Sequence, residues 1–143
     1  MKVAAILDRK GHDIHTVPPD ATVAEVSRLL TTHRVGALVV SNDGQAVTGI
    51  VSERDVVRRL AAIGPDALEE SVASVMTTAV VTCSPDDTTE GLMAVVTEHR
   101  IRHIPVIEDG QLVGVVSIGD IVAVRVRELE DETSQLRGYI TAG

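Results

Sequence analysis

A hydroxyl and a carboxylate recur at the same spacing in two parts of the chain. Gly114-Val115-Val116-Ser117-Ile118-Gly119-Asp120 ends in Ser-x-x-Asp, and so does Gly49-Ile50-Val51-Ser52-Glu53-Arg54-Asp55. At a strand-to-helix junction, this spacing puts both groups beside the free N–H groups of the helix start. The N–H groups and the helix dipole favour a phosphate there, and the carboxylate is suited to accept both hydroxyls of a ribose.

The same spacing also fits a capping box, in which the serine caps the helix and the aspartate answers from the third helical position. From one copy alone, the cap is the better interpretation. Two copies at matched positions favour a binding role as well, because one serine can do both.

The composition limits the function classes. The chain has 143 residues, a net charge of −8 and only one aromatic side chain among Phe, Trp and Tyr, which is Tyr139. A stacking platform for single-stranded nucleic acid needs aromatic side chains, and an anionic membrane surface attracts basic proteins. We therefore expect no nucleic-acid partner and no membrane partner, although a local basic cleft stays possible.

The cellular location is predicted from the length of the apolar runs and from the cysteine content. No apolar run reaches membrane-spanning length, and the apolar stretch at the N-terminus is too short for a signal peptide. The single cysteine, Cys83, excludes an internal disulfide framework and fits a reducing cytoplasm. We expect a cytoplasmic protein in which Cys83 is a small buried strand residue.

The spacing of the apolar residues predicts the helices and strands that position Ser52 and Asp55. Val3, Ile6 and Leu7 share one side of a short helical segment. After it we expect a strand at 15–17, a helix capped by Thr22 that runs to His33, strands at 37–40 and 47–52, and a helix at 53–63. The inward residues of that last helix are expected to be Val56, Val57, Leu60 and Ile63, and Gly64-Pro65 ends it.

The same order then recurs. Pro85, Asp86 and Thr88 follow Pro19, Asp20 and Thr22 at a shift of 66 residues, and the shift becomes 65 after the second hairpin. The expected equivalents are Val72, Val75 and Met76 for the opening segment, a strand at 80–83, a helix with Leu92, Met93, Val95 and Val96 inward, and a strand at 104–107. A repeat of this length is one supersecondary unit, β-α-β-β-α.

The predicted fold is therefore α+β, with two β-α-β-β-α repeats packed about a pseudo-twofold axis and two related clefts between them. The expected boundaries are 1–64 for the first repeat, 65–128 for the second and 129–143 for a tail helix. The last repeat helix is expected to run from Ile118 to about Glu132. Leu136, Tyr139 and Ile140 then form an amphipathic patch that either covers the core or serves as a dimer contact or a lid.

These repeats resemble the cystathionine β-synthase (CBS) domain, and the tandem resembles a Bateman module of the small stand-alone bacterial type. The resemblance covers residues 1 to about 128. It rests on the two Gly-h-h-Ser-x-x-Asp motifs, on Val75-Met76-Thr77, and on Glu98-His99-Arg100-Ile101-Arg102-His103-Ile104-Pro105-Val106. It implies a regulatory module that binds an adenosine ligand (AMP, ADP, ATP, NAD or S-adenosylmethionine) between the repeats, and that forms a disc-shaped homodimer.

The resemblance also implies roles for residues in one cleft. Asp120 accepts the ribose hydroxyls, with Ser117 near the ribose or phosphate, and Val115 and Val116 flank the adenine. Arg102 and His103 are the basic phosphate contacts. Backbone near Thr16, together with Ala37 and Leu38, completes this cleft.

In the other cleft, the equivalent residues are Asp55, Ser52, Ile50 and Val51. Backbone near Thr82 and the strand at Ile104-Pro105 complete it, and Arg54 reaches a phosphate. Gly36-Ala37 stands where the second repeat has Arg102-His103. We therefore expect both Ser/Asp pairs to be competent but the two clefts to differ in affinity.

Three functions compete. The leading hypothesis is a non-catalytic sensor that binds an adenosine nucleotide and changes the affinity of an unknown downstream protein. The second is a ligand-free dimeric interaction scaffold. The third is a small enzyme acting on a nucleotide, which is the weakest because no phosphate-binding loop and no nucleophile elbow is present in the sequence. We expect no metal site, because the histidines do not converge with other ligands.

Overall fold

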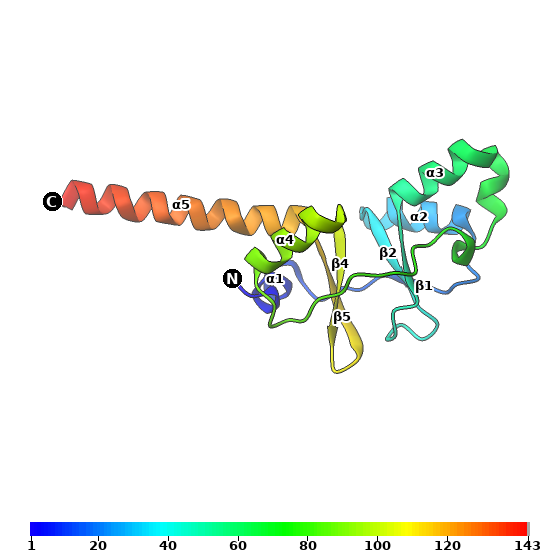
Figure 1. The fold of residues 1–143 in the computed structure, drawn as a ribbon, viewed down its shortest axis with the longest axis horizontal. Coiled ribbons are helices and arrows are strands. Elements are labelled where there is room, and N and C mark those ends of the chain that lie inside the picture. Colours follow the sequence, from blue (N-terminus) through cyan, green and yellow to red (C-terminus); the bar gives the residue numbers. More distant parts are fainter. Residues whose placement is uncertain (143) are drawn as a thin grey trace.

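The structure is a computed structural model that describes residues 1–142, so Gly143, the end of the expected tail, lies outside the described residues. Figure 1 shows two halves side by side and a long helix that extends from one of them. The elements are α1 (Val3–Lys10), β1 (Thr16–Val17), α2 (Val23–His33), β2 (Ala37–Val40), β3 (Gly49–Ser52), α3 (Glu53–Ile63), 3-10 turns at Gly64–Glu69 and Val72–Ser74, α4 (Thr89–His99), β4 (His103–Glu108), β5 (Gln111–Ser117) and α5 (Ile118–Ala142).

The first half is a three-stranded sheet covered by α2 and α3. Strand β1 runs parallel to β2, and β2 runs antiparallel to β3 with Ala37 opposite Ser52. All four residues of β2 are buried, because this strand lies in the middle of the sheet. The predicted strand at 47–52 begins two residues later, at Gly49.

The second half is a two-stranded antiparallel sheet, β4 with β5, in which His103 lies opposite Ser117. The strand predicted at 80–83 is wrong. Only Cys83 makes a bridge there, to Val106, through hydrogen bonds with the backbone of Pro105 and Ile107. The polar and proline-containing residues that follow Cys83 continue directly into a turn, so the segment is too short to add a third strand.

The two halves exchange their opening segments. Helix α1 belongs to the first repeat, yet Val3, Ile6 and Leu7 pack in the core of the second half. Val72, the equivalent of Val3, packs in the core of the first half. The backbone repeats this exchange, since the Val3 amide donates to Asp87 O (2.9 Å) and the Val72 amide donates to Ala21 O (2.7 Å).

Local hydrogen bonds also agree with a pseudo-twofold relation. The Glu53 amide donates to Gly36 O, and the equivalent Ile118 amide donates to Arg102 O. The predicted α+β fold with two related repeats is therefore confirmed. The sequence did not show that each repeat contributes its first segment to the other.

Several residues predicted to face inward are exposed. Val57 is 62% exposed, Ile63 41% and Met93 37%. On α3, Val56 is buried and Leu60 half-buried, so this face is narrower than the four-residue stripe that the sequence suggested. An α-helix advances about 100° per residue, so Val56 and Val57 cannot share a narrow face.

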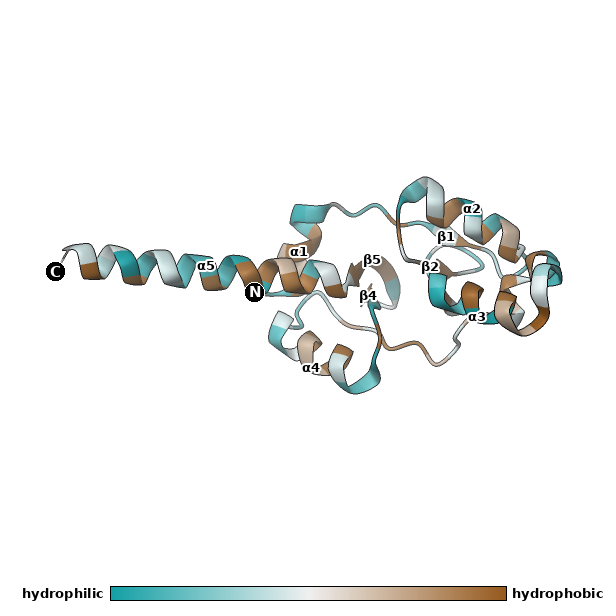
Figure 2. Cartoon of the chain, turned by 90° about the horizontal axis from the view of Figure 1, so that it is seen from above, coloured by the Kyte–Doolittle hydropathy of each residue, from teal (hydrophilic) through white to brown (hydrophobic). Residues whose placement is uncertain are grey.

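Helix α5 is longer than predicted and continues through the acidic stretch to Ala142. Figures 1 and 2 show its C-terminal part projecting away from both halves. Leu136, Tyr139 and Ile140 are 63%, 81% and 74% exposed. The interpretation that this patch covers the core of its own chain is therefore wrong.

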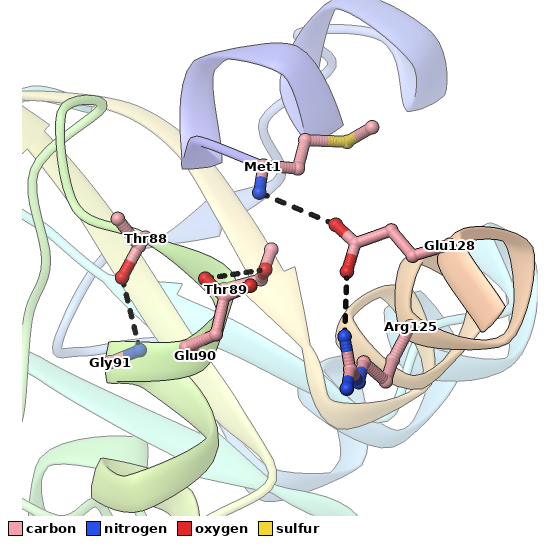
Figure 3. Close-up of polar contacts among 7 residues, drawn as sticks. All are labelled: Met1, Thr88, Thr89, Glu90, Gly91, Arg125 and Glu128. Carbon is pink, nitrogen blue, oxygen red and sulfur yellow. Dashed lines mark hydrogen bonds and ion pairs between the residues drawn. The ribbon is translucent and has the colours of Figure 1, made fainter. Parts of the chain in front are cut away.

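The base of α5 is tied to the N-terminus and lies beside α4. The amino group of Met1 donates to Glu128 Oε1 (3.3 Å), and Arg125 donates to Glu128 Oε2 (3.1 Å), as Figure 3 shows. In the same view, Thr88 caps α4 by accepting a hydrogen bond from the Gly91 amide (3.1 Å). These contacts hold the first turns of α5 in place, so its projecting part has a fixed direction at its start.

Candidate ligand site between the two halves

A cavity of about 400 Å³ lies between the halves. This volume is within the range of small-molecule sites, which is roughly 300–1,000 Å³. Its walls come from the loop after α1, from the loop before β2, and from β4, β5 and the start of α5. The lining residues are Lys10, Gly11, Asp13, His15, Arg34, Val35, Gly36, Ala37, His103, Val115, Ser117 and Asp120.

Ser117 and Asp120 form the expected reciprocal cap at the start of α5. The Asp120 amide donates to Ser117 Oγ (3.2 Å), and the Ser117 amide donates to Asp120 Oδ2 (2.9 Å). Ser52 and Asp55 make the same capping box at the start of α3. The cap interpretation is thus confirmed at both motifs, and the cap holds the Asp120 carboxylate at the cavity wall.

Lys10, at the end of α1, reaches this carboxylate from the first repeat. Its Nζ donates to Asp120 Oδ2 (2.7 Å) and to the backbone oxygen of Val115 (2.8 Å). Burial raises the pKa of Asp120, but the hydrogen bonds from Lys10 and from the Ser117 amide outweigh burial and hold that pKa below its usual value. Asp120 is therefore ionised at neutral pH.

His103 of β4 lies opposite Ser117 of β5 and lines the same cavity. A Cβ at Gly36 would lie 3.0 Å from His103 Cε1 and 3.1 Å from Nε2, so the ring packs closely against this glycine and would have to shift slightly to admit a larger residue. Burial lowers the pKa of His103, and the nearby Glu53 carboxylate opposes this effect. The imidazole is therefore neutral at pH 7.

The cationic side chains that line the cavity come from the first repeat. Arg34 follows α2 in the left-handed conformation (φ 55°), and Lys10 ends α1. His15 stacks on His33, with ring centroids 3.6 Å apart. Lys10 and Arg34 balance Asp13 and Asp120, so the lining carries both signs of charge in equal number, on a chain that is acidic overall.

The structure brings five of the predicted residues of this cleft to the cavity wall, namely Ala37, His103, Val115, Ser117 and Asp120. Val116 and Leu38 are buried in the two cores, with exposed fractions of 0% and 2%. Arg102 is exposed and does not line the cavity, and Thr16 lies next to the lining residue His15.

Sequence reasoning missed Lys10, Gly11, Asp13, His15, Arg34, Val35 and Gly36 as lining residues. The signal for Gly36 was present in the sequence, because Gly36 occupies the position that Arg102 has in the other repeat. Lys10 had no such signal, since a lysine at the end of a helix is ordinary.

The residues predicted for the second cleft lie around β3, α3 and β4. The Ile50 backbone makes two hydrogen bonds with Thr77, and Val51, Ile104 and Pro105 are buried. Arg54 and Thr82 are exposed. Asp55 Oδ2 accepts hydrogen bonds from the amide and hydroxyl of Ser52, so its partners differ from those of Asp120, which is also paired with Lys10.

Residues 1–142 also bear on metal binding, membrane insertion and thiol chemistry. That part of the chain holds no group of three or more His, Cys, Asp or Glu side chains placed to bind a metal ion. None of its helices combines the length and the apolar character needed to cross a membrane. Cys83 is buried, and burial raises the pKa of its thiol to about 12.

Comparison with known families agrees with this geometry. The model of the CBS domain matches residues 3–62 and 72–127, and the chain belongs to the CBS-domain family.

Among solved structures, the CBS-domain containing protein ATU1752 from Agrobacterium tumefaciens is 44% identical, with a TM-score of 0.85 over 87% of this chain and 99% of that chain. The CBS domain pair of protein MJ0100, solved in complex with 5′-methylthioadenosine and S-adenosyl-L-methionine, is 21% identical, with a TM-score of 0.80 over 90% of this chain and 98% of that chain. At that identity, the second likeness concerns the fold alone.

Among curated relatives, the mitochondrial CBS domain-containing protein CBSX3 of Arabidopsis thaliana is 40% identical over 87% of this chain, which spans 62% of that relative's length. The CBS domain-containing protein YhcV of Bacillus subtilis is 30% identical over 92% of this chain and 91% of its own length.

Proposed function

We propose that this chain is a non-catalytic regulatory module that binds an adenosine nucleotide (AMP, ADP, ATP or NAD) in the cavity between its halves. The observation that carries the proposal is the ionised Asp120 carboxylate, fixed by its cap at the wall of a cavity to which both repeats contribute. A carboxylate at a helix start is suited to accept the two ribose hydroxyls.

The other lining residues fit the remaining parts of such a ligand. Val115 offers an aliphatic surface for the adenine, and Ser117 lies beside the ribose position. Lys10 and Arg34 supply positive charge for a phosphate, and His103 supplies a further hydrogen-bond donor. The MJ0100 pair, which shares this fold, was solved with two adenosine-containing ligands. That supports an adenosine ligand as the class.

The second site proposed for this chain uses Ser52, Asp55, Ile50, Val51, Arg54, Thr82, Ile104 and Pro105. Asp55 has no counterpart of the Lys10 contact among the hydrogen bonds of the described residues, so we expect the two sites to differ in affinity. Binding in either site bridges the repeats. It therefore favours one relative arrangement of the halves or protomers, which an unidentified downstream protein would sense in the cytoplasm.

Calorimetric titration of the protein with AMP, ATP, NAD and S-adenosylmethionine, with GTP as the control, tests this proposal. We expect saturable binding of at least one adenosine ligand. Asp120→Asn should weaken binding about ten- to a hundredfold, because the ribose loses a charged acceptor. Asp55→Asn makes the equivalent change at the other motif and shows how much the second site contributes to binding.

Each variant must also be compared with the wild type in thermal unfolding, because the cap alone contributes about 1 kcal/mol to stability. Unchanged affinity in a folded Asp120→Asn variant contradicts the assignment of the site. A folded wild-type protein that binds no ligand of the panel favours the interaction scaffold. If chromatography shows that the protein converts ATP or NAD to products, the result favours an enzyme.

A further inference from the structure

Helix α5 carries an exposed apolar stripe on its projecting part. Its first turns dock through Ile121 and Val124, which are 0% and 3% exposed. Beyond them the helix leaves the body, as both views in Figures 1 and 2 show. Five exposed apolar side chains form the stripe. Their exposed fractions are 45% for Val122, 47% for Val126, 47% for Leu129, 63% for Leu136 and 74% for Ile140.

These residues repeat in steps of four and three when Thr133 is included. The positions 122, 126, 129, 133, 136 and 140 therefore form the alternating a and d positions of a heptad repeat. The a positions are Val126, Thr133 and Ile140, and the d positions are Val122, Leu129 and Leu136. β-branched residues at a and leucine at d favour a parallel coiled coil of two helices.

We propose that α5 pairs with α5 of a second copy of this chain, as a parallel two-stranded coiled coil over residues 122–140, hereafter the α5 seam. The seam is about 28 Å long at 1.5 Å per residue. Thr133 fits inside it, because its hydroxyl already donates to Leu129 O (2.9 Å) and only its methyl group meets the partner.

Charge complementarity identifies the second copy as the occupant and sets its direction. The positions that flank the seam are Arg125 and Glu132 at g, and Glu130 and Arg137 at e. In a parallel pair, each g position faces the e position five residues later on the other helix. Arg125 then meets the partner's Glu130, and Glu132 meets the partner's Arg137, and twofold symmetry repeats both attractive pairs.

An antiparallel pair in full overlap is disfavoured by the same residues. In the antiparallel pair, position 129 of one helix lies beside position 133 of the other. Glu130 then approaches the partner's Glu130, and Glu132 approaches the partner's Glu132, so like charges repel. Within one chain, Arg125 already contacts Glu128. That contact is exposed at Arg125 and contributes little, so it does not prevent the exchange of partners.

The pairing has a consequence for the ligand site. The twofold axis runs along the two helices, so the second halves of both protomers lie at the same end of the seam. Asp120 stands in the first turn of α5, two residues before Val122. One rigid helix therefore joins the cavity wall to the interface, although the pairing itself does not depend on a ligand.

Exchange of charges tests the direction of the pair. Sedimentation equilibrium of the wild type should give twice the chain mass of 15.2 kDa. Glu132→Arg alone and Arg137→Glu alone each place like charges across the seam, so each should weaken the dimer about tenfold. An equimolar mixture of the two single variants should form a heterodimer of wild-type strength, and the double variant should recover the homodimer.

Cysteine crosslinking gives a second measurement. Leu136→Cys places two thiols face to face at a d position, whereas Ser134→Cys, at the outward b position, is the matched control. Cys83 is buried and should not contribute. We expect rapid disulfide formation only for Leu136→Cys under mild oxidation.

Circular dichroism of each variant verifies folding, which should persist because these side chains are exposed in the single chain. A monomeric wild type overturns the proposal. So does a dimer whose strength is unaffected by both charge reversals and in which Leu136→Cys does not crosslink.

Discussion

The carboxylate of Asp120 has a structural and a chemical role that compete for the same oxygen. Oδ2 accepts both the Ser117 amide, which caps α5, and the ammonium of Lys10. In the proposed complex, the ribose hydroxyls approach this carboxylate and the phosphate offers Lys10 an anionic partner. Lys10 can therefore move from the carboxylate to the phosphate and stay paired with an anion during binding.

His103 leads to a prediction about pH. Burial lowers its pKa, so the ring is neutral at pH 7, although Glu53 opposes that effect. A phosphate beside the ring stabilises the charged form and raises this pKa in the complex. Binding then takes up a proton, so affinity should rise as pH falls from 8 towards 6. Titrations in buffers with different ionisation enthalpies measure that uptake.

The phosphate of the ligand also titrates in this range, with a second pKa of about 6. His103→Gln is therefore measured beside the wild type, because the contribution of the ligand cancels in the difference. The variant should show less proton uptake and a flatter pH dependence. Identical pH profiles for the two proteins would show that the phosphate lies away from His103.

At the scale of elements, two glycines admit the exchanged segments. A Cβ at Gly114 in β5 would lie 2.6 Å from Leu7 Cδ2, and a Cβ at Gly49 in β3 would lie 2.6 Å from Met76 Sδ. Leu7 and Met76 are equivalent residues of the two opening segments. Each repeat thus uses its Gly-h-h-Ser motif twice: the glycine receives the segment of the other repeat, and the serine caps the next helix.

Gly114→Ala should lower the free energy of unfolding by about 1–3 kcal/mol, because the added methyl group overpacks against the buried Leu7. Leu7→Ala alone should cost about 2–5 kcal/mol through the cavity that it leaves. The double variant should lose less than the sum, because each change relieves the other. Urea unfolding measures all three proteins. Gly138→Ala is the control, since no heavy atom lies near its position and it should not destabilise.

Much of this arrangement could be predicted from the sequence, because its signals are local. Ser-x-x-Asp determines a cap within one turn, and Thr22 and Thr88 mark the starts of α2 and α4. The pairing of Lys10 with Asp120 could not be predicted in this way. It joins residues 110 positions apart through the exchange of α1, and an amphipathic pattern shows which face is buried but not which half it packs on.

At the scale of the whole molecule, the exchange makes each half depend on the other. Helix α1 completes the core of the second half, and the segment around Val72 completes the core of the first. Opening one half removes a segment from the other, so neither core can be lost alone without exposing buried side chains of both. The chain should therefore unfold as one cooperative unit.

This cooperativity can be measured with one substitution in each core. Leu30→Ala changes the first core and Leu92→Ala the second, at residues that are 6% and 3% exposed. Each should cost about 2–5 kcal/mol, and in native-state hydrogen exchange each should lower the protection of β2 and β4 by the same amount. The protein concentration is kept equal, because a dimer adds its own coupling. If Leu30→Ala lowered protection only in β2, the halves would be independent folding units, and binding between them could reorient the halves without involving their cores.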